Sequence, residues 1–281
     1  MMPPNKNPSH PMGPIRIAAT YKPIEGEEVL IQKSPTVIVI PARMGSTRLF
    51  GKPLLLIGDK ILVQHVWEKA IQVPSADKVI VATDHEDIAG ACQSFGAEVA
   101  MTSTLLESGT DRVAAATKAL PFNSIVVNLQ GDLPFVNPVI VEELIRDLMI
   151  HRTSAMSTPC NRRHYSDKAW MQTDVVKVVK DRNGKALYFS RSPIPWNIVQ
   201  QGYWLHHFGI YAVRSQYLQA YTTYRQSDLE LAEGLEQLRY LQAGYSINIV
   251  ETLHQAGIEI NTERDLEEGR TWYEKNMETA A

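Results

Sequence analysis

Three basic side chains stand close together near the start of the patterned sequence, in a stretch that contains no acid. Arg43, Arg48 and Lys52 make residues 35–58 basic, although the whole chain of 281 residues has a net charge of −3. Arginine and lysine bind phosphate groups through charge-assisted hydrogen bonds. The backbone around Gly45 can add N–H groups that bind phosphate oxygens. The stretch therefore predicts a loop that binds a triphosphate, and three solvated surface cations are the alternative.

This loop matches neither of two common nucleotide-binding motifs. A P-loop has four residues between its glycines and a Ser or Thr after its lysine. Here five residues separate Gly45 from Gly51, and Pro53 follows Lys52. A dinucleotide-binding fingerprint is excluded as well, because the sequence contains no Gly-X-Gly. The predicted phosphate contacts therefore rest on the cations and on the loop backbone.

A carboxylate suited to a cation follows a second apolar run. Asp132 ends the tripeptide Gln-Gly-Asp directly after the run at residues 124–129. In an open α/β sheet, ligands bind beyond the carboxyl ends of the strands, and Mg²⁺ is held by carboxylates, waters and substrate phosphates. Asp132 is therefore the predicted Mg²⁺ ligand, and the alternative is a turn aspartate. The segment Ser-Gly-Thr-Asp-Arg at residues 108–112 begins a helix. Its free N–H groups either bind an anion or a base edge, or belong to a plain capped helix.

Short apolar runs alternate with amphipathic segments over residues 36–150. Strands are predicted at residues 36–40, 78–83, 98–101 and 124–129. Helices are predicted at residues 62–73, from an N-cap at Asp84 to Gly96, from an N-cap at Thr110 to Leu120, and from Asn137 to about residue 150. Strands that are apolar on both faces and alternate with helices predict a parallel sheet covered on both sides.

The pattern changes after residue 151. Strands without intervening helices are predicted at residues 175–179, 186–190 and 205–213, with a hairpin turn at Asn183 and Gly184. A helix at 228–243, a strand at 246–251 and a helix from about residue 263 follow. The predicted fold class is therefore α/β, a mostly parallel sheet flanked by helices, with a mixed-sheet insertion at residues 151–225.

One domain is expected over residues 35–275, between an N-terminal extension at 1–34 and a tail at 276–281. Residues 1–14 contain five prolines and show no periodicity, which predicts a largely disordered extension with at most a short strand at 15–19. Two cysteines, Cys92 and Cys160, are too few for a disulfide scaffold or a four-thiolate metal site. We expect no membrane span and no secretory signal peptide, because no sufficiently long apolar run occurs. The negative net charge argues against a nucleic-acid partner.

The loop IPARMGSTRLFGKPLL resembles the signature loop of the sugar cytidylyltransferase family, above all its 3-deoxy-manno-octulosonate (Kdo) branch. Further stretches match that family in the same order: VIVATDHEDI (79–88), MTSTLLESGTDR (101–112), VNLQGDLPFVNP (127–138), LYFSRSPIPW (187–196), HHFGIYAVR (206–214), LELAEGLEQLRYL (229–241) and NTERDLE (261–267). The resemblance implies a nucleotide-diphospho-sugar-transferase-like (Rossmann-like) fold. It also implies that the insertion at 151–225 serves sugar binding and dimerisation.

The resemblance implies an activity as well. CMP would pass from CTP to the anomeric hydroxyl of Kdo, an acidic eight-carbon sugar, with release of pyrophosphate in lipopolysaccharide precursor synthesis. A variant sugar such as 8-amino-Kdo remains open. Mg²⁺ is the implied cofactor, a homodimer the implied assembly, and the cytoplasm the implied location.

Residue roles follow from the matched motifs. Catalytic roles are implied for Arg43, Arg48, Lys52 and Asp132. Nucleotide contacts are implied for Ala42, Arg43, Met44, Gly45, Arg48, Lys52, Thr102, Ser108, Gly109, Arg112 and Gln130. Sugar contacts are implied for Gln130, Arg191, His207, Tyr211, Glu236 and Gln237. We expect Lys52 to stabilise charge at the α-phosphate and Arg48 to hold the β- and γ-phosphates.

Two positions depart from the family pattern. Leu133 replaces the glutamate of Gln-Gly-Asp-Glu-Pro, and Asn261 replaces an aspartate that is the second metal ligand in the relatives. Asparagine keeps a carbonyl oxygen but loses the charge, so Mg²⁺ would be held more weakly. Glu259 is a candidate to compensate. Phe50, in place of a family proline, is expected to alter only loop rigidity.

Two other functions remain open. An acylneuraminate cytidylyltransferase is the nearest alternative enzyme, although residues 187–196 and 235–241 favour the Kdo branch. The departures at Leu133 and Asn261 also leave open a nucleotide-binding protein that has lost catalysis.

Overall fold

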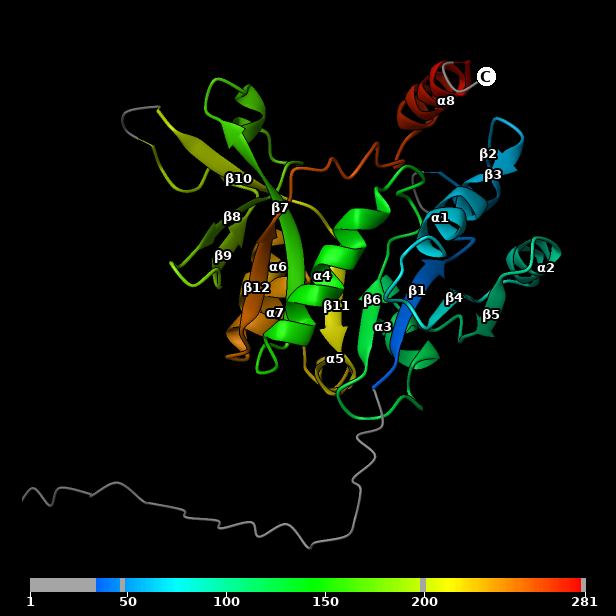
Figure 1. Ribbon diagram of the computed structural model, residues 1–281, viewed down its shortest axis with the longest axis horizontal. Coiled ribbons are helices and arrows are strands. Elements are labelled where there is room, and N and C mark those ends of the chain that lie inside the picture. Colours follow the sequence, from blue (N-terminus) through cyan, green and yellow to red (C-terminus); the bar gives the residue numbers. More distant parts are fainter. Residues whose placement is uncertain (1–33, 46–48, 198–200, 279–281) are drawn as a thin grey trace, which may run out of the picture. The chain divides into compact units, whose positions relative to one another are not determined.

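A ten-stranded sheet runs through the part of the chain that the computed structural model describes, residues 34–45, 49–197 and 201–278. Its order is β5-β4-β1-β6-β11-β7-β10-β8-β9, and β12 pairs with β7 off this path (Figure 1). The strands are β1 Thr36–Ala42, β4 Lys78–Thr83, β5 Glu98–Met101, β6 Ile125–Asn128, β7 Met156–His164, β8 Lys177–Lys180, β9 Ala186–Ser190, β10 Tyr203–His207, β11 Tyr211–Arg214 and β12 Ile247–Glu251. A separate hairpin joins β2 Leu56–Ile57 to β3 Lys60–Ile61. The predicted strand at residues 15–19 lies outside the described residues.

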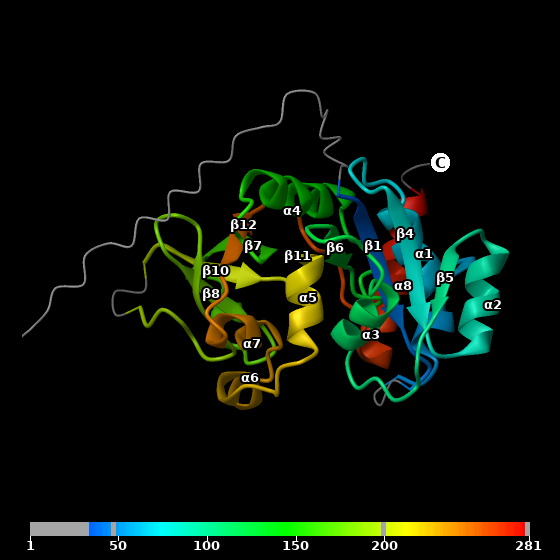
Figure 2. The same cartoon turned by 90° about the horizontal axis from the view of Figure 1, so that it is seen from below.

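The first half of the sheet is parallel, as predicted. β1 pairs in parallel with β4 and β6, and β4 pairs in parallel with β5. The helices of this half are α1 Leu62–Ala70, α2 Glu86–Ser94, α3 Gly109–Ala116 and α4 Pro138–Ile150. Figure 2 shows α4 on one face of the sheet and α3 on the other. A covered parallel sheet of this kind places ligands beyond the carboxyl ends of its strands.

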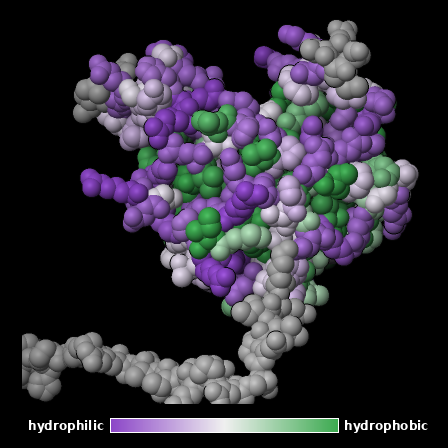
Figure 3. Space-filling model, in the orientation of Figure 1, coloured by the Kyte–Doolittle hydropathy of each residue, from purple (hydrophilic) through white to green (hydrophobic). Residues whose placement is uncertain are grey.

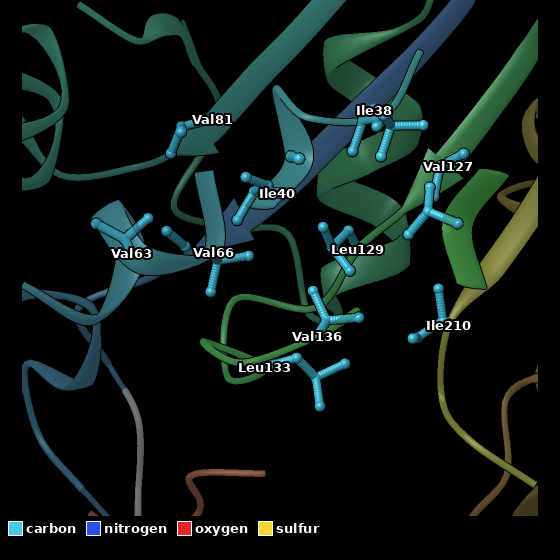
Figure 4. Close-up of a cluster of buried hydrophobic side chains, with 14 of the residues drawn as sticks. Ile38, Ile40, Val63, Val66, Val81, Val127, Leu129, Leu133, Val136 and Ile210 are labelled. Carbon is cyan, nitrogen blue, oxygen red and sulfur yellow. The ribbon is translucent and has the colours of Figure 1, made fainter. Parts of the chain in front are cut away.

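The strand β1 is buried on both faces, which explains why its sequence reads as a continuous apolar run. Ile38 and Ile40 belong to the core between the sheet and helices α1, α2 and α4 (Figure 4). Val37 and Val39 belong to the core on the opposite face, which includes side chains of α3. Side chains that alternate between two buried faces make every position of the strand apolar.

Two predicted helix caps are wrong by one or two residues. His85, not Asp84, is the N-cap of α2, and its side chain accepts a hydrogen bond from the Asp87 N–H. Ser108, not Thr110, is the N-cap of α3. Asp84 accepts a hydrogen bond from Arg112 instead, and Thr110 donates one to Glu236. The local sequence does not reveal these contacts, because the partners are far apart in the chain.

The second half of the sheet is mixed, as predicted, but its central strand was not foreseen. β7 contains a proline and four polar or charged residues at its end, so it lacks the periodicity of a strand. It is nevertheless central, because β10 and β11 pair with it antiparallel and β12 pairs with it in parallel. The single strand predicted at 205–213 is two strands, β10 and β11, on opposite sides of β7. The predicted hairpin between β8 and β9 is confirmed.

The helix predicted at residues 228–243 is two short helices. A capping box at Ser227 begins α6 Asp228–Glu233, and Gly234, with φ of 63°, ends it before α7 Gln237–Gln242. A left-handed residue at this place is a common helix stop. The remaining helices are α5 Ser215–Tyr221, which the sequence did not predict, α8 Glu263–Glu278, and the 3-10 helices η1 Lys52–Leu54 and η2 Lys168–Met171.

On the face of the molecule seen in Figure 3, apolar side chains are interspersed among hydrophilic ones. Within the described ranges, no helix combines the length and the apolar character that crossing a bilayer requires.

Candidate functional site

A pocket of about 240 Å³ opens beside the carboxyl end of β1. Its walls come from the loop after β1, the turn after β6, the start of α3 and the segment before α8. The lining residues are Pro41, Ala42, Arg43, Lys52, Pro53, Gly109, Arg112, Gln130, Gly131, Asp132 and Asn261. Eight of these eleven residues carry a role predicted from the sequence, so the fold brings most of the predicted nucleotide side together.

The Lys52 ammonium contacts three oxygens in this pocket. Its Nζ donates to Asp132 Oδ2 at 3.0 Å and to the Ile260 carbonyl oxygen at 2.8 Å. A longer contact of 3.4 Å reaches Asn261 Oδ1. The Lys52 and Asp132 side chains are 16% and 19% exposed, so this ion pair is largely withdrawn from water. Lys52, the predicted catalytic lysine, therefore contacts both predicted metal ligands, Asp132 and Asn261.

Two glycines allow the backbone to approach closely around this lysine. Gly51 has φ of 65°, and its N–H donates to the Met44 carbonyl oxygen at 3.2 Å, which closes the loop just before η1. At Gly131, a Cβ atom would lie 2.7 Å from the Pro41 carbonyl oxygen. Only glycine fits there without a shift of the strand end, so the turn after β6 can lie against β1.

Of the other predicted residues in the basic loop after β1, only Arg43 lines the pocket among those that the structure describes. Arg43 is exposed and lines the pocket, and its Nη1 donates to the Glu107 carbonyl oxygen at 3.3 Å. Met44 packs against the core and Gly45 is exposed; neither is among the lining residues. Arg48 lies outside the described residues, so its predicted contact with the β- and γ-phosphates stays a prediction.

At the start of α3, the polar side chains bond mainly to one another. Ser108 Oγ accepts from the Asp111 N–H at 3.0 Å and donates to Asp111 Oδ2 at 2.8 Å. Arg112 lines the pocket but is only 2% exposed. Its Nη2 donates to Asp84 Oδ2 at 2.7 Å, and its Nη1 donates to Thr102 Oγ1. Ser108 and Thr102 thus hold α3 and Arg112 in place, and their direct contact with a nucleotide stays a prediction.

The predicted sugar contacts fall into three groups, the first of which is Gln130 in the 240 Å³ pocket. Tyr211, Glu236 and Gln237 line a second cavity, which has a volume of only about 20 Å³. A space of this size holds about one water molecule, so it does not hold a sugar in this conformation. Arg191 and His207 are not among its lining residues.

Glu236 is the charged group of the small cavity. Its Oε2 accepts a hydrogen bond of 2.5 Å from the Thr110 hydroxyl. Burial raises the pKa of Glu236, and the bond from Thr110 opposes that rise. Beside it, the Tyr211 hydroxyl donates to Gln237 Oε1 at 3.1 Å, and burial raises the pKa of Tyr211. Tyr211 and Gln237 are thus bonded to each other, whereas the Gln237 amide nitrogen has no hydrogen-bond partner in the described ranges.

Arg191 and His207 are held by protein partners. Arg191 Nε donates to the Glu233 carbonyl oxygen at 2.9 Å and its Nη1 to the Thr173 carbonyl oxygen at 3.1 Å. The His207 Nε2 lies 2.8 Å from Thr158 Oγ1. Burial lowers the pKa of His207 to about 3, so this ring is neutral at physiological pH. The contacts predicted between these two residues and a sugar stay predictions.

The pocket offers oxygen ligands that suit a small hard cation. Asp132 and Asn261 both turn an oxygen toward the same point, where the Lys52 ammonium provides a positive charge. The Asn261 Nδ2 donates to Glu259 Oε1 at 2.6 Å, which turns its Oδ1 toward the pocket. In the ranges that the structure describes, no three His, Cys, Asp or Glu side chains gather into a metal site. The two oxygens of Asp132 and Asn261 fit a cation that completes its shell with waters and substrate phosphates, as Mg²⁺ does.

The sequence did not predict three of the lining residues. It also gave no reason for the leucine at position 133, which the structure explains. Pro41, Pro53 and Gly131 line the pocket through backbone and ring atoms. Each of them is next in sequence to a predicted site residue, and this adjacency could have identified them. Leu133, which replaces a family glutamate, is 4% exposed and packs in the core shown in Figure 4. Its side chain thus serves packing rather than the pocket.

Comparison with known proteins agrees with this geometry. The chain matches the family model described as "Cytidylyltransferase" over residues 37–249. It is 39% identical over 256 residues to the 3-deoxy-manno-octulosonate cytidylyltransferase of Pasteurella multocida (strain Pm70), a match that covers 85% of this chain and 98% of the relative. Identity to the protein of the same name from Pseudomonas fluorescens (strain SBW25) is 42% over 246 residues, with 83% and 96% covered.

Solved structures agree as well. A CMP:2-keto-3-deoxy-manno-octonic acid synthetase complexed with CTP matches with a TM-score of 0.82 and 40% identity, over 86% of this chain and 100% of that one. A 4-diphosphocytidyl-2C-methyl-D-erythritol synthase from Anaerococcus prevotii, at 15% identity and a TM-score of 0.59, shares the fold alone.

Proposed function

Because this chain belongs to the cytidylyltransferase family, we propose that it transfers CMP from CTP to the anomeric hydroxyl of Kdo and releases pyrophosphate. The observation that carries this function is the match, at about 40% identity and over more than four fifths of the chain, to relatives whose names state it. The 240 Å³ pocket supports it, since Lys52, Asp132 and Gln130 meet there beyond the ends of β1 and β6.

The reaction is a substitution at the α-phosphorus of CTP. The sugar hydroxyl attacks that phosphorus and loses its proton, while the bond to the bridging oxygen breaks and pyrophosphate leaves with the electron pair. Catalysis of such a transfer rests on positioning and on stabilising negative charge. Lys52 is the best-placed cation for the α-phosphate, because it is fixed on the pocket wall. Arg43 is free enough at the exposed rim to follow the outer phosphates, together with Arg48.

We propose Mg²⁺ as the cofactor, held by Asp132 and more weakly by Asn261. The ion would supply charge neutralisation for the triphosphate and order its oxygens. Lys52 donates to Asp132 through Oδ2 alone, so the carboxylate keeps lone pairs with which it would hold the ion beside the lysine. The Asn261 carbonyl adds an oxygen but no charge, so Asp132 and the phosphates would carry most of the affinity.

The sugar acid enters from the Gln130 side of the pocket in this proposal. Gln130 lines the 240 Å³ pocket, whereas Tyr211, Glu236 and Gln237 line the 20 Å³ cavity. Widening that cavity would present hydroxyl, amide and carboxylate groups suited to a polyol. The carboxylate of the sugar calls for a cation, and Arg191 would have to exchange two backbone carbonyls for it. Separate assays with Kdo and with its 8-amino variant distinguish these two sugars.

We further propose a homodimer formed through residues 151–225, and a cytoplasmic location. Apolar side chains are exposed in that region, at Met171, Leu187 and Trp196. Exposed apolar groups on a mixed-sheet insertion are suited to a subunit interface. Light scattering of the purified full-length chain tests the dimer, and cell fractionation tests the location.

Release of pyrophosphate tests the activity. The full-length chain is incubated with CTP, Mg²⁺ and one sugar acid at a time: Kdo, 8-amino-Kdo or an acylneuraminate. We expect release with Kdo or its 8-amino variant and none above background with the acylneuraminate. No release with any of them, together with CTP binding in calorimetry, would instead favour the impaired nucleotide-binding homologue that Asn261 suggests.

A further inference from the structure

A row of four side chains links the pocket of about 240 Å³ to the small cavity of about 20 Å³. Gln130 lines the pocket and Glu236 lines the cavity, with Asn128 and Thr110 between them. Gln130 Nε2 donates to Asn128 Oδ1 at 3.1 Å. Asn128 Nδ2 donates to Thr110 Oγ1 at 3.2 Å, and the Thr110 hydroxyl donates to Glu236 Oε2 at 2.5 Å.

All three hydrogen bonds run in the same direction, and the bond to Glu236 fixes that direction. The Thr110 hydroxyl has a single hydrogen, and it donates this hydrogen to Glu236 Oε2. The Thr110 oxygen can then only accept, which turns the amide nitrogen of Asn128 toward it. The Asn128 carbonyl therefore faces the other way and requires a donor, which is the amide nitrogen of Gln130.

The middle of this row is shielded from water. Asn128 is 2% exposed and Thr110 is 8% exposed, so their mutual bond is shielded from bulk solvent. Buried polar groups that lose a partner are costly, so such a row keeps its direction. Thr110 is available for this role because Ser108 caps α3 in its place.

One polar atom of Gln130 remains for a ligand, its amide oxygen. No residue in the described ranges donates a hydrogen bond to it. It lies over Gly109 at the start of α3, where a Cβ atom would come within 3.5 Å of it. Gly109 and Gln130 line the same pocket, so the oxygen is on the ligand side.

We infer that Glu236, Thr110 and Asn128 are positioning residues that hold Gln130 with its amide oxygen toward the pocket, where it accepts a hydrogen bond from a substrate N–H or O–H group. The inference rests on the proposed function, which supplies the substrates. The donor is either the exocyclic amine of cytosine or a hydroxyl of the sugar acid. In the first case the orientation favours CTP over UTP, because UTP has a carbonyl oxygen where CTP has the amine.

Thr110→Val and Thr110→Ser form a matched pair for the test. Valine keeps the shape of threonine and removes the hydroxyl, whereas serine keeps the hydroxyl. We measure the dissociation constants of CTP and UTP by calorimetry without sugar, and the KM for Kdo. In Thr110→Val we expect either a CTP-to-UTP affinity ratio about fivefold lower or a Kdo KM about fivefold higher, the loss of one hydrogen bond. Thr110→Ser should stay within about twofold of the unchanged chain.

The two outcomes separate the two donors. A changed nucleotide ratio assigns the cytosine amine, and a changed Kdo KM assigns a sugar hydroxyl. The side-chain amide signals of Gln130 in ¹⁵N-labelled protein should shift in Thr110→Val and in Glu236→Gln, since a glutamine at 236 can donate and lets the row reverse. Thr117→Val is the control, because within the described residues this hydroxyl at the end of α3 bonds only to the Val113 and Ala114 carbonyl oxygens and lines neither the pocket nor the cavity.

Folded Thr110→Val with an unchanged nucleotide ratio, an unchanged Kdo KM and unchanged Gln130 signals would overturn the inference. If that variant does not fold, the Gln130 signals of Glu236→Gln decide in its place. Failure of the proposed function is distinguishable, since it would appear as no pyrophosphate release by the unchanged chain, whereas nucleotide affinities and amide signals require no turnover.

Discussion

The nucleotide side and the sugar side of this molecule are built in different ways. The nucleotide side is an open pocket of about 240 Å³ whose shape comes from backbone: strand ends, a glycine turn and a helix start. The sugar side is a small cavity of about 20 Å³, where Tyr211 bonds to Gln237 and Thr110 bonds to Glu236. A site made by backbone exists before its ligand arrives, whereas a cavity too small for its ligand must first widen, and side chains that are bonded to each other must exchange partners. The difference predicts that CTP binds to a ready site and that the sugar binds after rearrangement.

Lys52→Met tests the nucleotide side and should have the largest effect. Methionine keeps the length of the side chain but removes the charge at the α-phosphate. We expect kcat/KM for pyrophosphate release to fall by about 10³-fold, or about 4 kcal/mol of transition-state stabilisation. Lys60→Met is the matched control, since Lys60 pairs with Glu68 away from the pocket and its loss should leave the rate unchanged. A Lys52→Met enzyme within threefold of the unchanged chain would mean that the lysine serves only the fold.

Stability against acid should reveal the burial of two histidine rings in the sugar half of the molecule. Burial lowers the pKa of His207 to about 3 and that of neighbouring His206 to about 4, against about 6.5 in the unfolded chain. Between these values the unfolded state binds more protons, so stability falls as the pH drops below about 6.5. Each histidine contributes about 1.4 kcal/mol per pH unit, together about 3 kcal/mol per unit.

Urea unfolding at a series of pH values from about 4.5 to 8 measures this slope. His206→Asn should reduce this slope by the contribution of about one proton, about 1.4 kcal/mol per pH unit, because one of the two neutral rings is removed. His151→Asn is the control, since His151 is exposed at the end of α4. Stability that does not change between pH 8 and 5 would contradict the burial of both rings.

Arg191→Ala tests whether the sugar side rearranges around a carboxylate. We expect the KM for Kdo to rise about tenfold, the loss of one charge-assisted contact, while the KM for CTP stays within about twofold. Arg162→Ala is the control in the same half, because Arg162 pairs with Glu251 on β12. An equal rise in the KM for Kdo and the KM for CTP would contradict the assignment of Arg191 to the sugar side.

Asn261→Asp should have the smallest effect and concerns the nucleotide side alone. An aspartate restores the charge of the family ligand, so the Mg²⁺ concentration for half-maximal activity should fall about threefold. Glu259 opposes the gain, because its carboxylate lies 2.6 Å from the Asn261 amide nitrogen and would repel a second carboxylate. The double variant Asn261→Asp/Glu259→Gln should therefore gain more than the single one.

Binding of Mn²⁺, followed by electron paramagnetic resonance without turnover, measures the metal affinity directly. The affinity should rise from the unchanged chain to Asn261→Asp and again to the double variant. Glu259→Gln alone is the control for the lost surface charge. A metal requirement that neither the single nor the double variant changes would remove position 261 from the metal site.

The parallel half was predictable because its signals are local. The run at β1 is apolar at every position, and its alternate side chains enter two cores, so length and composition suffice. β7 was missed for the opposite reason. Its residues Asn161 and Arg162 carry no strand signal, and its place in the sheet comes from neighbours on both sides. Its burial is a property of the assembled sheet.

The sequence by itself determined the fold class, the basic loop, the carboxylate after β6 and, through its motifs, the family. These are encoded by residues that are contiguous in the chain. Only the tertiary structure decided which polar groups are occupied: that Lys52 neutralises Asp132, that Arg112 is paired with Asp84, and that Thr110 serves Glu236 instead of a helix end. The physical reason is that a hydrogen bond depends on distance and direction between atoms far apart in the chain. Residue type only lists the bonds that are possible, and packing selects among them.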